Sequence, residues 1–108
     1  MNTWYDNPGP TLAEVASLPG PAVLEFGTPW CGYCRAAQGP IAQALGDPSQ
    51  VRHLKIEDAS GRPLGRAYRV KLWPTLIFLR DGHEVARLVR PADADAIRSA
   101  LALTTAGT

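Results

Sequence analysis

Two cysteines separated by two residues, Cys31 and Cys34, constrain the fold of this chain more than any other feature. The apolar run at 22–26 precedes them and is typical of a buried strand. An alanine-rich stretch with helical spacing follows them and reaches Leu45. This order places Cys31 at the start of a helix and Cys34 one turn further along the same face. We therefore expect the two thiols to act as a pair.

The helix start gives the two thiols unequal roles. First-turn N–H groups and the helix macrodipole stabilise negative charge, so they favour a thiolate at Cys31. Cys34 is then placed to attack a mixed disulfide formed on Cys31, which releases the partner and closes a small ring. Gly32 permits a close approach. The spacing predicts Cys31 as the exposed nucleophile and Cys34 as the sheltered resolving thiol.

Two alternatives also fit a Cys-x-x-Cys motif: two buried cysteines spaced by chance, and a metal site. Zinc usually takes four ligands, and the remaining soft candidates are His53 and His83. These histidines stand in a predicted strand and after a predicted turn, without a second cysteine pair. The residues therefore favour redox chemistry and no metal.

The length of 108 residues predicts a single domain spanning 1–108. Eleven lysines and arginines against ten aspartates and glutamates leave a net charge of +1, which excludes the strong basic bias of a dedicated nucleic-acid binder. The start of the chain lacks the apolar run of about 7–15 residues of a secretory signal, and no run reaches the about 20 residues of a membrane helix. We expect a cytoplasmic protein, in a compartment that keeps thiols reduced.

Helical and alternating patterns divide the rest of the chain into short elements. A capping box at Thr11 precedes a predicted helix at 12–18, and Pro40 predicts a kink in the helix at 31–45. The other predicted elements are strands at 22–26, 51–57, 75–79 and 84–89, a hairpin turn at 81–82, and helices at 62–69 and 93–103. Together they predict an α/β fold with a central mixed sheet and helices on both faces.

These segments, in this order, resemble the thioredoxin family over nearly the whole chain. Residues 30–34 read Trp-Cys-Gly-Tyr-Cys and are similar to the family's W-C-G-x-C motif. Residues 22–26 look like the strand before that motif, 73–75 like the cis-proline loop and 81–85 like the last hairpin. The resemblance implies the thioredoxin fold and a thiol–disulfide oxidoreductase whose two thiols are the redox centre, with no bound cofactor.

The resemblance also implies a substrate surface and partners. Pro74 would follow a cis peptide bond and lie against the cysteines, where a neighbouring backbone group pairs with an extended substrate. Disulfide-containing proteins or glutathione-like thiols would be the partners, with a recycling reductase. The protein is expected to be a monomer that binds neither nucleic acid nor membrane. The implied substrate-binding residues are Trp30, Gly32, Tyr33, Trp73, Pro74 and Thr75.

Glu25 is an acid inside an otherwise apolar strand. Burying a charge is costly, so we expect a raised pKa and a functional role. The thioredoxin family usually has an aspartate here, which assists deprotonation of the second cysteine. The resemblance therefore implies Glu25 as proton acceptor and donor for Cys34, with Lys55 as a neighbouring charge partner. A purely structural pair of Glu25 and Lys55 is the alternative.

The chain departs from the family pattern at a few positions near the site. Tyr33 stands where the strongly reducing thioredoxins have a proline, and Cys-Gly-Tyr-Cys also occurs in branches that oxidise or isomerise disulfides. The residues between the cysteines tune the relative stability of thiolate and disulfide, so both directions stay open. Pro91 stands at about the position where the family has a glycine, in the substrate-facing loop after the last strand. A thioredoxin-fold binding module with a structural disulfide is a further alternative.

Basic residues gather ahead of the cis-proline loop. Arg62, Arg66 and Arg69 are expected to share one face of the helix at 62–69. Such a face would favour acidic partner proteins or an anionic thiol such as glutathione. The alternative is an ordinary solvated helix face.

Overall fold

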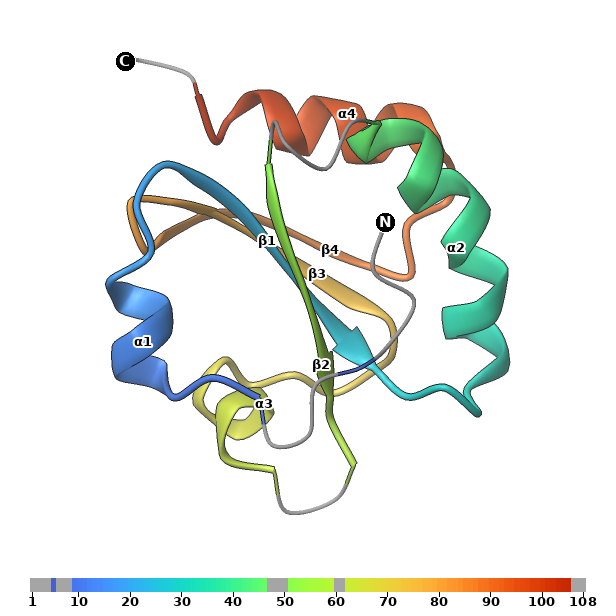
Figure 1. Cartoon of the computed structure of the whole chain (residues 1–108). Coiled ribbons are helices and arrows are strands. Elements are labelled where there is room, and N and C mark those ends of the chain that lie inside the picture. The colour runs from blue at the N-terminus through green and yellow to red at the C-terminus, as the bar shows by residue number, and fades with distance from the viewer. Residues whose placement is uncertain (1–4, 6–8, 47–50, 60–61, 106–108) are drawn as a thin grey trace.

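The computed structural model describes residues 5, 9–46, 51–59 and 62–105. Within these ranges four strands form one sheet in the order β2-β1-β3-β4 (Figure 1). Strand β1 pairs parallel with β2 and antiparallel with β3, and β3 pairs antiparallel with β4. The predicted mixed sheet is confirmed, with β1 in its interior. The strands are β1 (Pro21–Gly27), β2 (Arg52–Glu57), β3 (Thr75–Arg80) and β4 (His83–Val89).

Helices cover both faces of the sheet, as predicted. Figure 1 shows α1 and α3 on one side and α2 and α4 on the other. None of the helices in the described ranges is long and apolar enough to cross a membrane. The helices are α1 (Leu12–Ala16), α2 (Gly32–Leu45), α3 (Pro63–Ala67) and α4 (Ala94–Ala102).

Alternation along β1 divides the core into two clusters. Leu24 and Phe26 belong to the cluster that also contains Val15 of α1 and Leu64 of α3. Val23 belongs to the cluster shared with α2 and α4. Since successive strand residues point to opposite faces, Glu25 points to the α2 side, the side on which the cysteine-bearing helix packs.

Helix α2 begins at Gly32, with Cys31 as its N-cap residue. The Cys34 backbone N–H donates to Cys31 Sγ at 3.3 Å, so a thiol takes the place of the usual capping oxygen. Pro40 lies inside the helix and has no N–H to donate. Figure 1 shows α2 bending along its length, in agreement with the predicted kink.

The predicted arginine face is wrong, because α3 is shorter than the pattern suggested. The helix ends at Ala67, Arg62 is its N-cap residue, and Arg69 has a positive φ of 57° beyond the helix. Tyr68 and Val70 both pack against the cluster on this side of the sheet. The chain must therefore leave the helix to bury both side chains, and the three arginines do not share one helical face.

The hairpin turn between β3 and β4 packs against the end of α1. A substitution in this turn is therefore expected to destabilise the fold. Asp81 and Gly82 have φ values of 51° and 81°, as a type I′ turn requires, and a Cβ at Gly82 would collide with the Ala16 carbonyl. We expect Gly82→Ala to lower the free energy of unfolding by about 2 kcal/mol or more, through backbone strain and the clash. Urea unfolding followed by circular dichroism measures the loss.

Gly32→Ala is the matched control for that substitution. Gly32 is the first residue of α2, and a Cβ built there meets nothing within 4 Å beyond its immediate chain neighbours and its own helix backbone. Because alanine is a better helix former than glycine, the control is expected to hold or raise stability. Equal losses in both variants would contradict the turn argument.

Candidate active site

The two cysteines lie where the sequence predicts, as free thiols at the N-terminal end of α2. Cys34 is fully buried, and Cys31 is 9% exposed. Cys31 is thus the more accessible sulfur but is less exposed than expected, because its side chain turns back over the first helical turn toward the Cys34 N–H. The Cys31 N–H donates to the Thr28 carbonyl at 3.3 Å, and this hydrogen bond closes the turn at 28–31 between β1 and α2.

The surroundings of Cys34 keep it protonated. Burial, and next its hydrogen bond to the Cys31 sulfur and the charge there, raise the pKa of Cys34 to about 12. The Thr28 backbone N–H and the Tyr5 hydroxyl both hydrogen-bond Cys34 and act in the opposite direction. Two of the causes that raise the pKa depend on a free Cys31 sulfur. They disappear when that sulfur is bonded to a partner.

Glu25 is fully buried and is surrounded by hydrogen-bond donors. His53 Nε2 lies 2.8 Å from Glu25 Oε1, and Gln38 Nε2 donates to Oε2 at 2.8 Å. The Tyr5 hydroxyl donates to Oε2 at 3.3 Å, and Lys55 Nζ lies 4.0 Å away. The carboxylate therefore has partners from the N-terminal segment, α2 and β2.

The pKa of Glu25 is lowered, which corrects the predicted rise. Burial raises the pKa, but hydrogen bonds from His53 and Gln38 and the charge of Lys55 together outweigh it. The sheet register pairs Glu25 with Lys55, as the sequence suggested. His53 lies two residues earlier on the same strand and so faces the same side. Its contact with Glu25 could have been found from that spacing, whereas the sequence had suggested it only as a metal candidate.

Gln38 ties the carboxylate to the helix that carries the cysteines. It lies one turn after Cys34, and its amide nitrogen donates both to Glu25 Oε2 and to the Cys34 carbonyl, each at 2.8 Å. Lys55 Nζ donates to the Gln38 side-chain oxygen at 2.8 Å. Gln38 was not foreseen, and its spacing of four residues after Cys34 is the one signal that could have indicated it.

The implied cis-proline loop lies next to Trp30 and Tyr33, the residues that adjoin the cysteines. The Trp73–Pro74 peptide bond is cis. Trp30 is 67% exposed, and its ring meets the Trp73 ring edge-on with the centroids 5.6 Å apart. The Trp73 indole N–H donates to Asp58 Oδ2 at 2.9 Å. Burial raises the pKa of Asp58, and this hydrogen bond opposes the rise.

Arg90 connects this loop to the residue between the cysteines. It has a positive φ of 50°, its backbone N–H donates to the Pro74 carbonyl at 2.9 Å, and its Nε donates to the Trp73 carbonyl at 2.8 Å. Its guanidinium lies over the Tyr33 ring, 3.8 Å from the centroid. Arg90 could not be identified from the sequence, because neither its spacing nor its neighbours indicate such a contact.

The other predicted site residues differ in what they present. Tyr33 is 61% exposed, and Gly32 has open space around its Cα. Thr75 is buried, and its hydroxyl donates to the Leu72 carbonyl at 2.6 Å, so its side chain faces inward. A cavity of about 270 Å³ next to the motif is lined by Tyr33, Ala36, Ala37, Pro40, Pro74, Arg90, Pro91 and Ala92.

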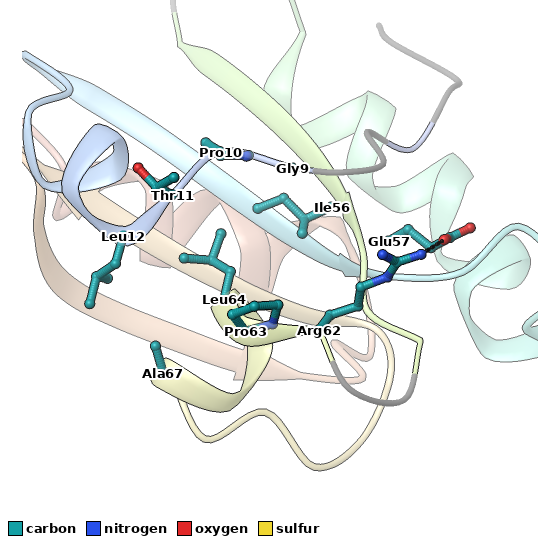
Figure 2. A pocket seen from close by; sticks show the side chains of 10 residues that line it. All are labelled: Gly9, Pro10, Thr11, Leu12, Ile56, Glu57, Arg62, Pro63, Leu64 and Ala67. Atoms are coloured by element: carbon teal, nitrogen blue, oxygen red, sulfur yellow. Dashed lines mark hydrogen bonds and ion pairs between the residues drawn. The ribbon is translucent and has the colours of Figure 1, made fainter.

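A second cavity of about 460 Å³ lies away from the cysteines, between the segment before α1, the end of β2 and α3 (Figure 2). Ile56 and Leu64, which belong to the core cluster on the α1 and α3 side of the sheet, line this cavity. An ion pair between Arg62 and Glu57, with N and O 3.2 Å apart, lies at one end of it. No residue of the cysteine site contributes to it. In the described part of the chain, no three His, Cys, Asp or Glu side chains gather as a metal site requires.

A thiol that caps a helix, a buried thiol one turn behind it and an exposed aromatic and cis-proline rim can exchange disulfides with a docked partner. The fold and this site define a thiol–disulfide oxidoreductase. The Thioredoxin family model matches residues 12–103. The chain belongs to the thioredoxin family.

Individual relatives agree with this assignment. A solved structure of thioredoxin 2 from Pseudomonas aeruginosa PAO1 in its reduced form is 50% identical, covers 99% of this chain and 100% of that chain, and has a TM-score of 0.85. A thioredoxin from Chlamydia trachomatis serovar D is 38% identical over 80 residues, which are 72% of this chain and 76% of that protein. Protein disulfide-isomerase A3 from Gallus gallus is 35% identical over 88 residues, which are 81% of this chain but only 17% of that longer protein.

Proposed function

We propose that this protein reduces disulfides in partner proteins, with Cys31 as nucleophile and Cys34 as resolving thiol. One observation carries the proposal: Cys34 is fully buried, and its N–H donates to Cys31 Sγ at 3.3 Å. Cys31 therefore meets a partner first, and Cys34 stands close behind it to complete the exchange.

In the first step the Cys31 thiolate attacks one sulfur of the partner's disulfide. A bond forms between Cys31 Sγ and that sulfur, the partner's S–S bond breaks, and the other partner sulfur leaves as a thiolate that takes up a proton. In the second step Cys34 loses its proton and attacks Cys31 Sγ. The second partner sulfur leaves as a thiolate, so two electrons have passed to the partner and a Cys31–Cys34 disulfide remains.

We assign Glu25 as the proton acceptor and donor for Cys34. Glu25 is ionised at neutral pH because its pKa is lowered, so it is able to accept a proton. Cys34 holds its proton in the free dithiol because burial and the Cys31 sulfur raise its pKa to about 12. Formation of the mixed disulfide removes the Cys31 contributions and so promotes proton loss at the required moment.

The substrate surface consists of the exposed Trp30 and Tyr33 with Gly32, and of the loop formed by Trp73 and Pro74. Thr75 contributes through its backbone, since its side chain faces inward. The expected partners are disulfide-containing proteins or glutathione-like thiols, and a reductase that supplies two electrons to regenerate the dithiol. We expect the protein to act as a single-domain monomer in the cytoplasm, because the site is complete in one chain and the proposed reductase works in a compartment that keeps thiols reduced.

An isomerase or oxidase is the second candidate function. Tyr33 between the cysteines favours it, together with the 35% identity to a protein disulfide-isomerase over 88 residues. The residues between the cysteines set the stability of the thiolate against the disulfide. The two candidates therefore differ in reduction potential.

The reduction potential of the Cys31–Cys34 pair, equilibrated against glutathione, tests the direction. A reductase is expected to have a potential nearer to about −270 mV than to about −180 mV, and to reduce insulin disulfides catalytically. A potential near the higher value would favour the isomerase or oxidase. A pair that neither reacts nor can be reduced would favour a binding module with a structural disulfide.

A further inference from the structure

The hydroxyl of Tyr5 lies between the buried carboxylate and the resolving thiol. It donates to Glu25 Oε2 at 3.3 Å and also hydrogen-bonds Cys34. The Lys55 ammonium lies over the Tyr5 ring, 4.6 Å from the centroid, which fixes the ring against β2. One side chain of the N-terminal segment thus touches both groups that the resolving step uses.

Gly27 makes room for this arrangement. A Cβ built at Gly27 would lie 2.6 Å from Cys34 Sγ and 3.2 Å from the Tyr5 hydroxyl oxygen. Both atoms therefore occupy the space beside the end of β1 that a side chain would fill. Their closeness to one point places the Tyr5 hydroxyl beside the Cys34 sulfur.

The other neighbours of Glu25 do not reach the sulfur of Cys34. Gln38 binds the carboxylate and the Cys34 carbonyl oxygen. His53 and Lys55 approach the carboxylate from β2. Among the described residues, Tyr5 is the side chain with hydrogen bonds to both the carboxylate and the thiol.

We propose that Tyr5 is a catalytic residue of the resolving step, whose hydroxyl connects the Cys34 thiol to the Glu25 carboxylate. This inference rests on the proposed role of Cys34. The Cys34 proton passes to the Tyr5 oxygen while the Tyr5 proton passes to Glu25 Oε2. The thiolate left on Cys34 accepts a hydrogen bond from Tyr5 and attacks Cys31 Sγ. The released partner thiolate takes a proton from solvent, and Glu25 returns its proton to solvent before the next cycle.

Tyr5 remains a neutral phenol throughout this exchange. Burial and the negative charges of Glu25 and Cys34 raise the pKa of Tyr5, so ionisation of the ring is disfavoured. The hydroxyl therefore works by receiving one proton as it gives another. In the resting protein it points to Glu25, and after transfer it stabilises the new thiolate.

Tyr5→Phe tests the proposal, since it removes the hydroxyl and keeps the ring under Lys55. An excess of an aromatic disulfide such as dithiobis(nitrobenzoic acid) releases one thionitrobenzoate when Cys31 attacks and a second when Cys34 resolves. We expect the first release to be unchanged and the second to slow by about tenfold or more at neutral pH, as for a lost hydrogen bond to a charged sulfur. The pH profile of the second release is expected to move to higher pH.

Two comparisons separate a proton connection from a packing effect. Tyr68→Phe removes another partly buried hydroxyl outside the site and is expected to leave both releases unchanged. In a Glu25→Gln background, Tyr5→Phe is expected to slow the second release far less, because the acceptor is already gone. Full additivity, or an unchanged second release in Tyr5→Phe, would overturn the role of Tyr5. Loss of the first release from the unaltered protein would overturn the proposed function instead.

Discussion

Replacing Cys34 with serine is expected to stop the reaction at the mixed disulfide, so that the protein remains covalently bound to its partner. Cys31 keeps its place at the start of α2 and still attacks, but no thiol stands behind it to release the partner. Catalytic reduction of insulin is expected to fall to the uncatalysed background. Non-reducing electrophoresis and intact-mass spectrometry detect the adduct, and a reducing agent is expected to cleave it.

Cys31→Ser is the matched control for this trap. It leaves a thiol at Cys34, but that thiol is fully buried and held protonated by its surroundings. We expect neither turnover nor an adduct. Normal turnover by Cys34→Ser would show that Cys34 does not resolve the intermediate, and an adduct on Cys34 in the control would reverse the two roles.

Glu25→Ala is expected to lower the free energy of unfolding at pH 7 by about 3–5 kcal/mol, the usual effect of removing one member of a buried charge network. His53 and Lys55 have side chains that are only 5% and 3% exposed, and they would lose the carboxylate between them. Gln38 would lose one acceptor as well. Urea unfolding gives the difference directly.

The difference in unfolding free energy between the unaltered protein and Glu25→Ala is expected to depend on pH. Because the pKa of Glu25 is lowered from its ordinary value of 4.5, the stabilisation is fully present above that value and is lost as the pH falls through the lower folded pKa. The stability difference between the two proteins is therefore expected to narrow in acid, below about pH 4.5. A constant difference across this range would show that the network does not favour the ionised carboxylate.

Asp95→Ala serves as the surface comparison. Asp95 pairs with Arg98 at 2.7 Å, but its side chain is 88% exposed. Water and salt screen such pairs, so the substitution is expected to change stability little at any pH. Equal losses for Asp95 and Glu25 would remove burial as the reason for the effect at Glu25.

The elements that the sequence predicted well are those with a local pattern. Apolar runs located the four strands, and the Asp81-Gly82 turn follows from its φ requirements. The cysteine pair was located from its position between a strand and a helix. The cis bond before Pro74 came from the family resemblance, because no local pattern requires it.

The contacts that complete the site could not be predicted in the same way. Tyr5, Gln38 and His53 reach Glu25 from 20, 13 and 28 residues away along the chain. Such contacts depend on the packing of Tyr5 and α2 against the sheet, and only the spacings of Gln38 and His53 leave a signal that could have indicated them. The pKa of Glu25 was therefore predicted to shift in the wrong direction. The sequence indicated that the carboxyl is buried, but it did not indicate most of the hydrogen-bond donors around it.

Arg90 fixes the rim of the site before any partner arrives. Its backbone and side chain hold both carbonyls of the cis-proline loop, and its guanidinium covers Tyr33. Binding normally costs entropy because loops and side chains become ordered. Since Arg90 already holds this rim in place, binding requires little further ordering of the protein. The remaining entropy loss falls on the segment that carries the partner's disulfide. If the protein reduces partner disulfides as proposed, we expect selection to depend on how readily that segment extends, so that disulfides in flexible segments are reduced faster than those held in rigid frameworks.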